Sequence, residues 1–129
     1  MRDEVSDAHQ VSDVHRVTDA DTARALGSGE VPVLGTPRLI AWLEAATVRA
    51  AAPFTGPGET TVGTAVRVRH LGATHVGGRV EVTARPPART GARRLTFAVR
   101  AVDAAGLAVA EGEIDRAVVD RRRFLERHT

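Results

Sequence analysis

The feature that most constrains this chain is a change of hydrophobic period near its middle. Over residues 36–51 the apolar residues recur at the spacing of one face of a helix. From residue 60 onward apolar and polar residues alternate, which is the period of half-buried strands. A sheet built from such strands needs its apolar face covered, and the helix has a matching apolar stripe. The pattern therefore predicts an α+β fold.

The predicted helix has clear boundaries. Thr36 is a favourable N-cap residue, and Pro37 suits the first helical position, where its missing N–H costs nothing. At the other end, Pro53 and the Gly-Pro-Gly run at 56–58 stop a helix and turn the chain. We therefore expect one long helix from Thr36 to Ala51.

Four strands are predicted after the helix. They cover residues 60–70, 79–85, 94–102 and 107–119. Because short turns join consecutive runs, we expect an antiparallel meander, with Gly112 as the site of a β-bulge. Strict alternation places His70 on the same face of the first strand as Val62, and Gly63 on the opposite face.

Length and composition indicate one domain, residues 1–129, whose first 30 residues are weakly patterned. Within that segment residues 11–17 indicate a short strand or an irregular lead-in, and residues 121–127 indicate a short terminal helix. The chain has no cysteine, which excludes a disulfide framework and a thiolate site. Its five histidines show no metal-ligand spacing, so we expect no metal site.

The net charge of the chain says little about its function, but the spread of the arginines along the sequence is informative. All 18 basic residues are arginine, so a net charge of +2 coexists with a pI of about 10.8 because arginine keeps its proton to very high pH. The arginines are not gathered into one run, and we expect no nucleic-acid partner. No apolar run of about 18 residues predicts a membrane span, and no apolar leader begins the chain. We expect a cytoplasmic protein.

Two polar residues stand out against this pattern. Glu44 lies at the edge of the helix's apolar stripe with no arginine one turn away, so it is either solvated or functional. His70 ends the first long strand and is either a satisfied histidine at the rim or a proton-transfer group. Thr36, in contrast, is fully explained as an N-cap.

A set of short motifs spanning residues 31–124 resembles the fluoroacetyl-CoA thioesterase family. The matching segments are Leu34-Gly35-Thr36, Trp42-Leu43-Glu44-Ala45-Ala46, Pro57-Gly58-Glu59, Thr61-Val62-Gly63-Thr64, Val66-Arg67-Val68-Arg69-His70, Ala73-Thr74, residues 91–97, Glu111-Gly112 and residues 116–120. The resemblance implies a hot-dog fold, in which a curved antiparallel sheet wraps a long helix. It also implies an acyl-CoA thioesterase with Thr36, Glu44 and His70 as catalytic residues and the Gly63 backbone close to the thioester.

The same resemblance implies no cofactor apart from the CoA of the substrate, and a homodimer that could pair into a tetramer. One segment departs from the family. The fluoroacetate-specific enzyme closes its pocket with phenylalanines a few residues before the threonine, whereas residues 27–33 here contain no aromatic residue. We therefore expect thioester hydrolysis but not fluoroacetyl specificity, with CoA or an acyl-carrier protein as the carrier.

Two other functions stay open at this point. The chain could be a non-catalytic hot-dog module that binds an acyl thioester or a related small ligand, or a hot-dog dehydratase, although the Asp–His pattern of such dehydratases is not found. Surface arginines could contact the CoA phosphates, or could simply be solubilising charges. Those considered are Arg38, Arg67, Arg69 and Arg79.

Overall fold

The structure is a computed structural model that describes residues 10–89 and 91–127. Its elements in chain order are β1 (Val11–Arg16), η1 (Asp19–Asp21), α2 (Ala23–Leu26), α3 (Thr36–Ala51), η2 (Ala52–Phe54), β2 (Glu59–His70), β3 (Arg79–Ala84), β4 (Ala88–Arg89), β5 (Arg94–Asp103), β6 (Ala108–Asp120) and α4 (Arg121–Arg127). The predicted α+β class, the long helix, the strand before it, the four strands after it and the terminal helix are confirmed. Residues 1–9 of the weakly patterned segment lie outside the described residues. None of the described helices is both long enough and apolar enough to cross a membrane.

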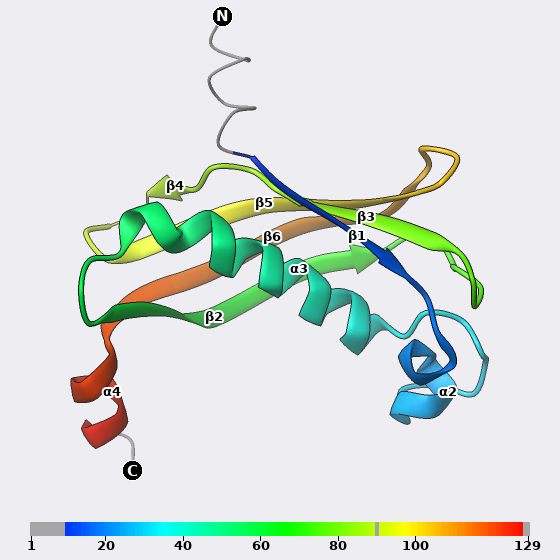
Figure 1. The fold of residues 1–129 in the computed structure, drawn as a ribbon, viewed down its shortest axis with the longest axis horizontal. Coiled ribbons are helices and arrows are strands. Elements are labelled where there is room, and N and C mark those ends of the chain that lie inside the picture. The colour runs from blue at the N-terminus through cyan, green and yellow to red at the C-terminus, as the bar shows by residue number, and fades with distance from the viewer. Residues whose placement is uncertain (1–9, 90, 128–129) are drawn as a thin grey trace, which may run out of the picture.

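The strands form one antiparallel sheet that curves around α3 (Figure 1). Its order is β1-β3-β5-β6-β2, with the short β4 pairing to β5, so the predicted meander is wrong for β2. β2 pairs with β6 along its whole length instead of with β3. The physical reason is length, since β6 has 13 residues and can pair with all of the 12-residue β2, whereas β3 has six. The predicted β5–β6 hairpin is confirmed, with Gly106 in the left-handed region at its turn.

The predicted bulge at Gly112 is also wrong. Gly112 pairs in regular register with Val68 on β2 and with Val99 on β5. The glycine is needed for close approach of two backbones, because a Cβ at this position would clash with the Arg67 carbonyl. Gly112 therefore lets β2 lie tightly against β6.

The irregularity in this strand pair lies in β2 itself, where the register shifts between Gly63 and Ala65. Thr64 is the extra residue, and one extra residue reverses the alternation of side chains beyond it. Gly63 and His70 consequently both face α3, which corrects the prediction that they lie on opposite faces. This reversal brings two parts of the candidate site to one side of the sheet.

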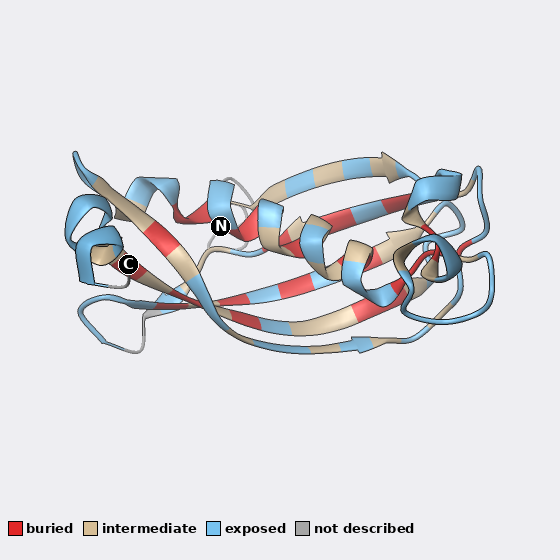
Figure 2. Cartoon of the chain, turned by 90° about the horizontal axis from the view of Figure 1, so that it is seen from below, coloured by how far each residue is buried: buried red, intermediate tan, exposed pale blue. Residues whose placement is uncertain are grey.

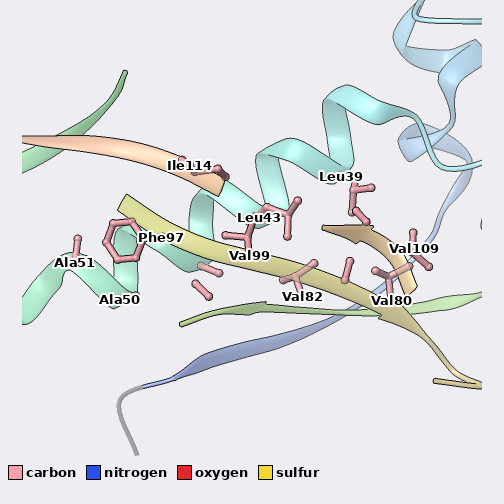
Figure 3. Packing of buried hydrophobic residues seen from close by; sticks show 14 of the residues in the cluster. Leu39, Leu43, Ala50, Ala51, Val80, Val82, Phe97, Val99, Val109 and Ile114 are labelled. Atoms are coloured by element: carbon pink, nitrogen blue, oxygen red, sulfur yellow. The ribbon is translucent and has the colours of Figure 1, made fainter. Parts of the chain in front are cut away.

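The core lies between α3 and the sheet. The buried face of the helix turns toward the strands (Figure 2). In Figure 3 Leu43 from α3 lies near Val82 from the sheet, and Phe97 lies near Ala50 further along the helix; Leu43, Val82 and Phe97 are fully buried. Each such side chain contributes about 1.5–3 kcal/mol. This packing fixes α3 relative to β2 and so positions the polar residues that the two elements share.

Candidate active site

The first polar contact between α3 and β2 joins Thr36 at the start of the helix to His70 at the end of the strand. The Thr36 Oγ1 lies 2.8 Å from the His70 Nδ1. The prediction that Thr36 is the N-cap is wrong, because Thr36 is the first helical residue. Gly35 occupies the cap position without a side-chain hydrogen bond. A Cβ on Gly35 would lie 3.0 Å from the Ala23 backbone, so packing against α2 selects glycine there. The Thr36 hydroxyl is therefore available for the imidazole.

The His70 ring is held in a partly buried position. Burial lowers the pKa of the imidazole from its ordinary value, and the backbone of Gly72 opposes this to a smaller extent. The ring is therefore neutral near pH 7. Its Nε2 is buried and has no hydrogen-bond partner among the described residues. Buried polar atoms without a partner are rare in folded proteins and need a reason, of which a waiting substrate is one.

A pocket of about 370 Å³ opens beside the Thr36–His70 pair. Its walls are small or aliphatic and include Ala23, Gly29, Val31, Val33 and Leu71. None of the described residues that line it is Asp, Glu or Arg. The pocket therefore suits an uncharged, apolar group.

The second polar contact lies two helical turns further along α3. The Glu44 Oε2 is 3.6 Å from the Arg116 Nη1 on β6. The Arg116 side chain is only 7% exposed, whereas that of Glu44 is 39% exposed. Arg116 is fixed by Thr61 on β2, whose hydroxyl accepts from Nε at 2.8 Å and whose carbonyl accepts from Nη2 at 3.1 Å. We call Glu44, Thr61, Gly63 and Arg116 the charged cluster.

The sequence analysis missed Arg116. It found no cation within one turn of Glu44, but the partner comes from across the fold. The signal was present, because Arg116 interrupts an apolar face of β6 between Ile114 and Val118, both of which are buried. Burial lowers the pKa of the Arg116 guanidinium, and the Glu44 carboxylate opposes this. A buried cation of this kind needs such a counter-charge.

Gly63 lies directly beside the Glu44 carboxylate. A Cβ at this position would lie 2.7 Å from the Glu44 Oε2 and 3.5 Å from the Arg116 Nη1. The missing side chain therefore makes the room that the carboxylate occupies. Gly63 itself is exposed, so the carboxylate sits beside open backbone on an edge strand.

The structure thus groups the four predicted site residues in two sets. Thr36 contacts His70, and Glu44 lies against Gly63, all on the helix-facing side of the sheet. In the described part of the chain no hydrogen bond or ion pair joins the two sets. Thr36 and Glu44 are eight residues apart, about 12 Å along the helix axis. Among the described residues no group of three or more His, Cys, Asp or Glu is placed to hold a metal ion.

Comparison with known proteins identifies the family. A family model described as a fluoroacetyl-CoA-specific thioesterase matches residues 17–122. The chain belongs to the fluoroacetyl-CoA thioesterase family. Membership confirms the family predicted from the motifs and, with it, the thioester-hydrolase class.

Individual relatives agree with this assignment. The fluoroacetyl-CoA thioesterase of Streptantibioticus cattleyicolor is 39% identical over 92 residues, which are 71% of this chain and 65% of the relative. The solved structure of the fluoroacetyl-CoA thioesterase FlK has a TM-score of 0.81 at 32% identity, covering 93% of this chain and 94% of FlK. A thioesterase-superfamily protein from Thermus thermophilus has a TM-score of 0.80 at 28% identity, covering 92% and 91%. The predicted hot-dog fold is confirmed.

Proposed function

We propose that the chain hydrolyses acyl-CoA thioesters, with Thr36, Glu44 and His70 as its catalytic residues and Gly63 beside the thioester. The observation that carries the proposal is the Thr36–His70 contact, which holds a neutral imidazole and leaves its Nε2 for substrate. Family relatives support it, since FlK variants have been solved with acetyl-CoA and with fluoroacetate and CoA. No cofactor beyond the CoA of the substrate is needed.

The proposed chemistry breaks the acyl C–S bond and adds water across it. Glu44 attacks the acyl carbon or takes a proton from the attacking water. In its neutral form His70 takes a proton from the attacking water through Nε2 and passes that proton to the leaving thiolate. Thr36 orients the ring through its contact with Nδ1.

Arg116 is a positioning residue in this proposal. Its guanidinium is held by Thr61 on one side and faces Glu44 on the other, so it fixes where the carboxylate lies. It remains protonated at neutral pH even though burial lowers its pKa, because an arginine pKa is so high in water. The charge near Glu44 therefore does not change during the reaction.

The acyl group is proposed to be small and apolar rather than fluoroacetyl. Residues 27–33 contain no aromatic side chain that could cover the Thr36–His70 pocket. From this segment Ser28, Gly29, Val31 and Val33 line the pocket, so its wall offers no aromatic side chain that could close over a fluoroacetyl group.

The proposed assembly is a homodimer that pairs through β2. β2 is an edge strand of 12 residues, and such an edge presents unpaired backbone groups to a second chain. Two exposed apolar side chains lie on this strand or directly after it, Val66 and Leu71. Pairing of dimers into a tetramer and a cytoplasmic location stay predictions. Sedimentation in the ultracentrifuge at micromolar concentration tests the dimer.

Thiol release from a panel of acyl-CoAs tests the function. The panel contains short, medium and aromatic acyl groups, and wild type is compared with His70→Ala. We expect turnover of at least one aliphatic acyl-CoA by wild type and its loss in the variant. A folded wild-type dimer that releases no thiol from any of them would contradict the proposal and favour the non-catalytic binding module.

A further inference from the structure

The pocket beside Thr36 and His70 carries polar side chains on only part of its wall. Of the eleven described residues that line it, Ser28, Thr36 and His70 have a polar side chain, and the other eight are glycine, alanine, valine or leucine. Burying a charged group against such a wall without a partner is costly. The wall therefore favours an uncharged acyl chain and can distinguish such chains by their length.

Two of the wall residues, Val31 and Val33, lie in an extended segment between α2 and the start of α3 (Figure 1). The Ala23 N–H donates to the Val33 carbonyl at 2.8 Å, and the Arg24 N–H donates to the Val31 carbonyl at 3.3 Å. On its other side the segment forms a bridge between Val33 and His75. Because side chains two residues apart in an extended segment point to the same side, both valines face the pocket. Their positions are fixed before a substrate arrives.

The two valines keep apolar surface in contact with water although their backbone is held. Val31 is 57% exposed, and Val33 is half-buried. Apolar surface left open on the wall of a groove is a feature of ligand sites. An alkyl chain in the pocket covers both side chains and loses its own contact with water. Each methylene that is buried in this way strengthens binding about threefold to fourfold.

The volume of the pocket sets the length of chain that it can hold. A group the size of a water molecule takes about 30 Å³, so an acetyl group takes roughly 60 Å³ and a chain of six carbons roughly 180 Å³. The pocket has a volume of about 370 Å³. An acetyl group therefore leaves most of the wall wet, whereas a six-carbon chain fills about half of the pocket. The other half is left for the thioester and the start of the pantetheine arm.

We propose that Val31 and Val33 make the chain selective for uncharged aliphatic acyl groups of about four to six carbons. The inference rests on the proposed function and adds to it the length of the acyl group. It makes these two valines specificity-determining residues that take no part in the chemistry. Dicarboxylic acyl groups are disfavoured because no described lining residue is a cation, and aromatic groups because none offers a ring for stacking.

The test compares two double variants. The pocket variant, Val31→Thr with Val33→Thr, keeps the shape of both side chains but adds a hydroxyl to each. The control variant, Val14→Thr with Val102→Thr, makes the same change at one exposed and one half-buried valine, which pair with Glu81 from either side and do not line the pocket. Each protein is assayed with straight-chain acyl-CoAs from acetyl to octanoyl, and with succinyl-CoA and phenylacetyl-CoA. Circular dichroism confirms that all three proteins are folded.

We expect kcat/KM of wild type and of the control variant to rise about threefold per methylene from acetyl to hexanoyl, roughly 80-fold in all, and then to level off. In the pocket variant the whole rise should be less than about tenfold, because the chain now covers two hydroxyls. The inference is overturned if the pocket variant keeps the wild-type rise. It is equally overturned if wild type prefers acetyl-CoA, succinyl-CoA or phenylacetyl-CoA to hexanoyl-CoA.

A binding measurement separates this inference from the proposed function. S-alkyl-CoA thioethers carry chains of the same lengths but no carbonyl carbon to attack, so calorimetric titration with them needs no turnover. Affinity that rises with alkyl length in wild type and the control variant, but much less in the pocket variant, supports the inference even if no acyl-CoA is hydrolysed. Hydrolysis of acyl-CoAs together with equal thioether affinity at every length overturns the inference and leaves the proposed function standing.

Discussion

The two polar contacts that α3 makes with the sheet differ in kind. The Thr36–His70 pair, between α3 and β2, is uncharged at neutral pH and lies beside a pocket without charged residues, whereas the charged cluster sets a half-exposed Glu44 against a buried Arg116 on β6. α3 and β2 supply both side chains of the Thr36–His70 pair, whereas the charged cluster also needs Arg116 from β6. The difference teaches that burial sets the protonation of His70 at one end of the site, whereas the charge of Arg116 sets the position of Glu44 at the other. Proton transfer and attack on the acyl carbon are thereby separated along the helix.

The largest effect is expected from removing the negative charge of Glu44. Glu44→Gln keeps the shape and a hydrogen-bond acceptor but cannot attack or take a proton, so kcat should fall about 10³- to 10⁴-fold. Thiol release under saturating acyl-CoA measures it. Retention of more than a tenth of wild-type kcat would remove Glu44 from the chemistry.

The matched variant Glu44→Ala separates chemistry from stability. It leaves the buried Arg116 without its counter-charge, so the free energy of unfolding should fall by about 1–3 kcal/mol, toward the low end because Glu44 is half exposed. Urea titration compares Glu44→Ala and Glu44→Gln, both of which lack the carboxylate charge, with wild type. Wild-type stability in both variants would mean that the 3.6 Å contact does not compensate Arg116.

The next largest effect is expected at His70, whose imidazole changes protonation. His70→Gln should lower kcat/KM about 10²- to 10³-fold through loss of proton transfer. Because burial lowers the pKa of His70 below its ordinary 6.5, wild-type kcat/KM should be level above pH 6.5 and fall as the pH drops through that lowered pKa. A profile of kcat/KM against pH from 4.5 to 8.5, roughly two units either side of the ordinary value, measures both the loss in the variant and the acid limb of wild type. An acid limb that persists unchanged in His70→Gln would assign it to another group.

The same shift has a consequence for stability. The unfolded state binds the proton more tightly than the folded state, so the contribution of neutral His70 is complete above pH 6.5 and is lost as the pH falls toward the lowered pKa. Denaturant titrations of wild type and His70→Gln at about pH 5 and pH 7, below and above the ordinary pKa of 6.5, test the sign. The variant should lose less stability between the two than wild type does.

A smaller effect is expected at Gly63. Gly63→Ala places a Cβ within 2.7 Å of the Glu44 Oε2, so the carboxylate must move. Because the displaced atom is the end of a flexible side chain, stability should change little while kcat falls roughly 10- to 100-fold. Ala65→Gly, beyond the bulge and directed away from the helix, is the control. A fully active Gly63→Ala would show that the position of the carboxylate is not critical.

The smallest effect is expected at Thr36. Thr36→Val keeps the shape but removes the hydroxyl that bonds Nδ1, and kcat should fall about tenfold, the value of one hydrogen bond. Thr36→Ser keeps the hydroxyl and should recover most of the loss. If valine and serine behave alike, the contact seen at 2.8 Å does not orient the ring during turnover.

Much of this arrangement could be predicted from the sequence, and what could not be has a common cause. Helix and strand bounds follow from local periodicity, and the site residues came with the motifs. The partner of β2 and the pairing of Glu44 with Arg116 depend on contacts between distant segments, which no local pattern encodes. The bulge at Thr64 escaped because a threonine there fits an unbroken alternation, so Gly63 was placed on the wrong face. Thr36 looked like a cap because the packing of Gly35 against α2 is not visible in the sequence.

The central claim is that the uncharged pair and the charged cluster act on one thioester. A double-mutant cycle on kcat/KM with Glu44→Gln, His70→Gln and the combined variant tests it most directly. If the two ends act as a unit, the combined variant should be about as impaired as the worse of the two single variants. Losses that multiply in the combined variant would mean that the two ends act independently, and would contradict the account.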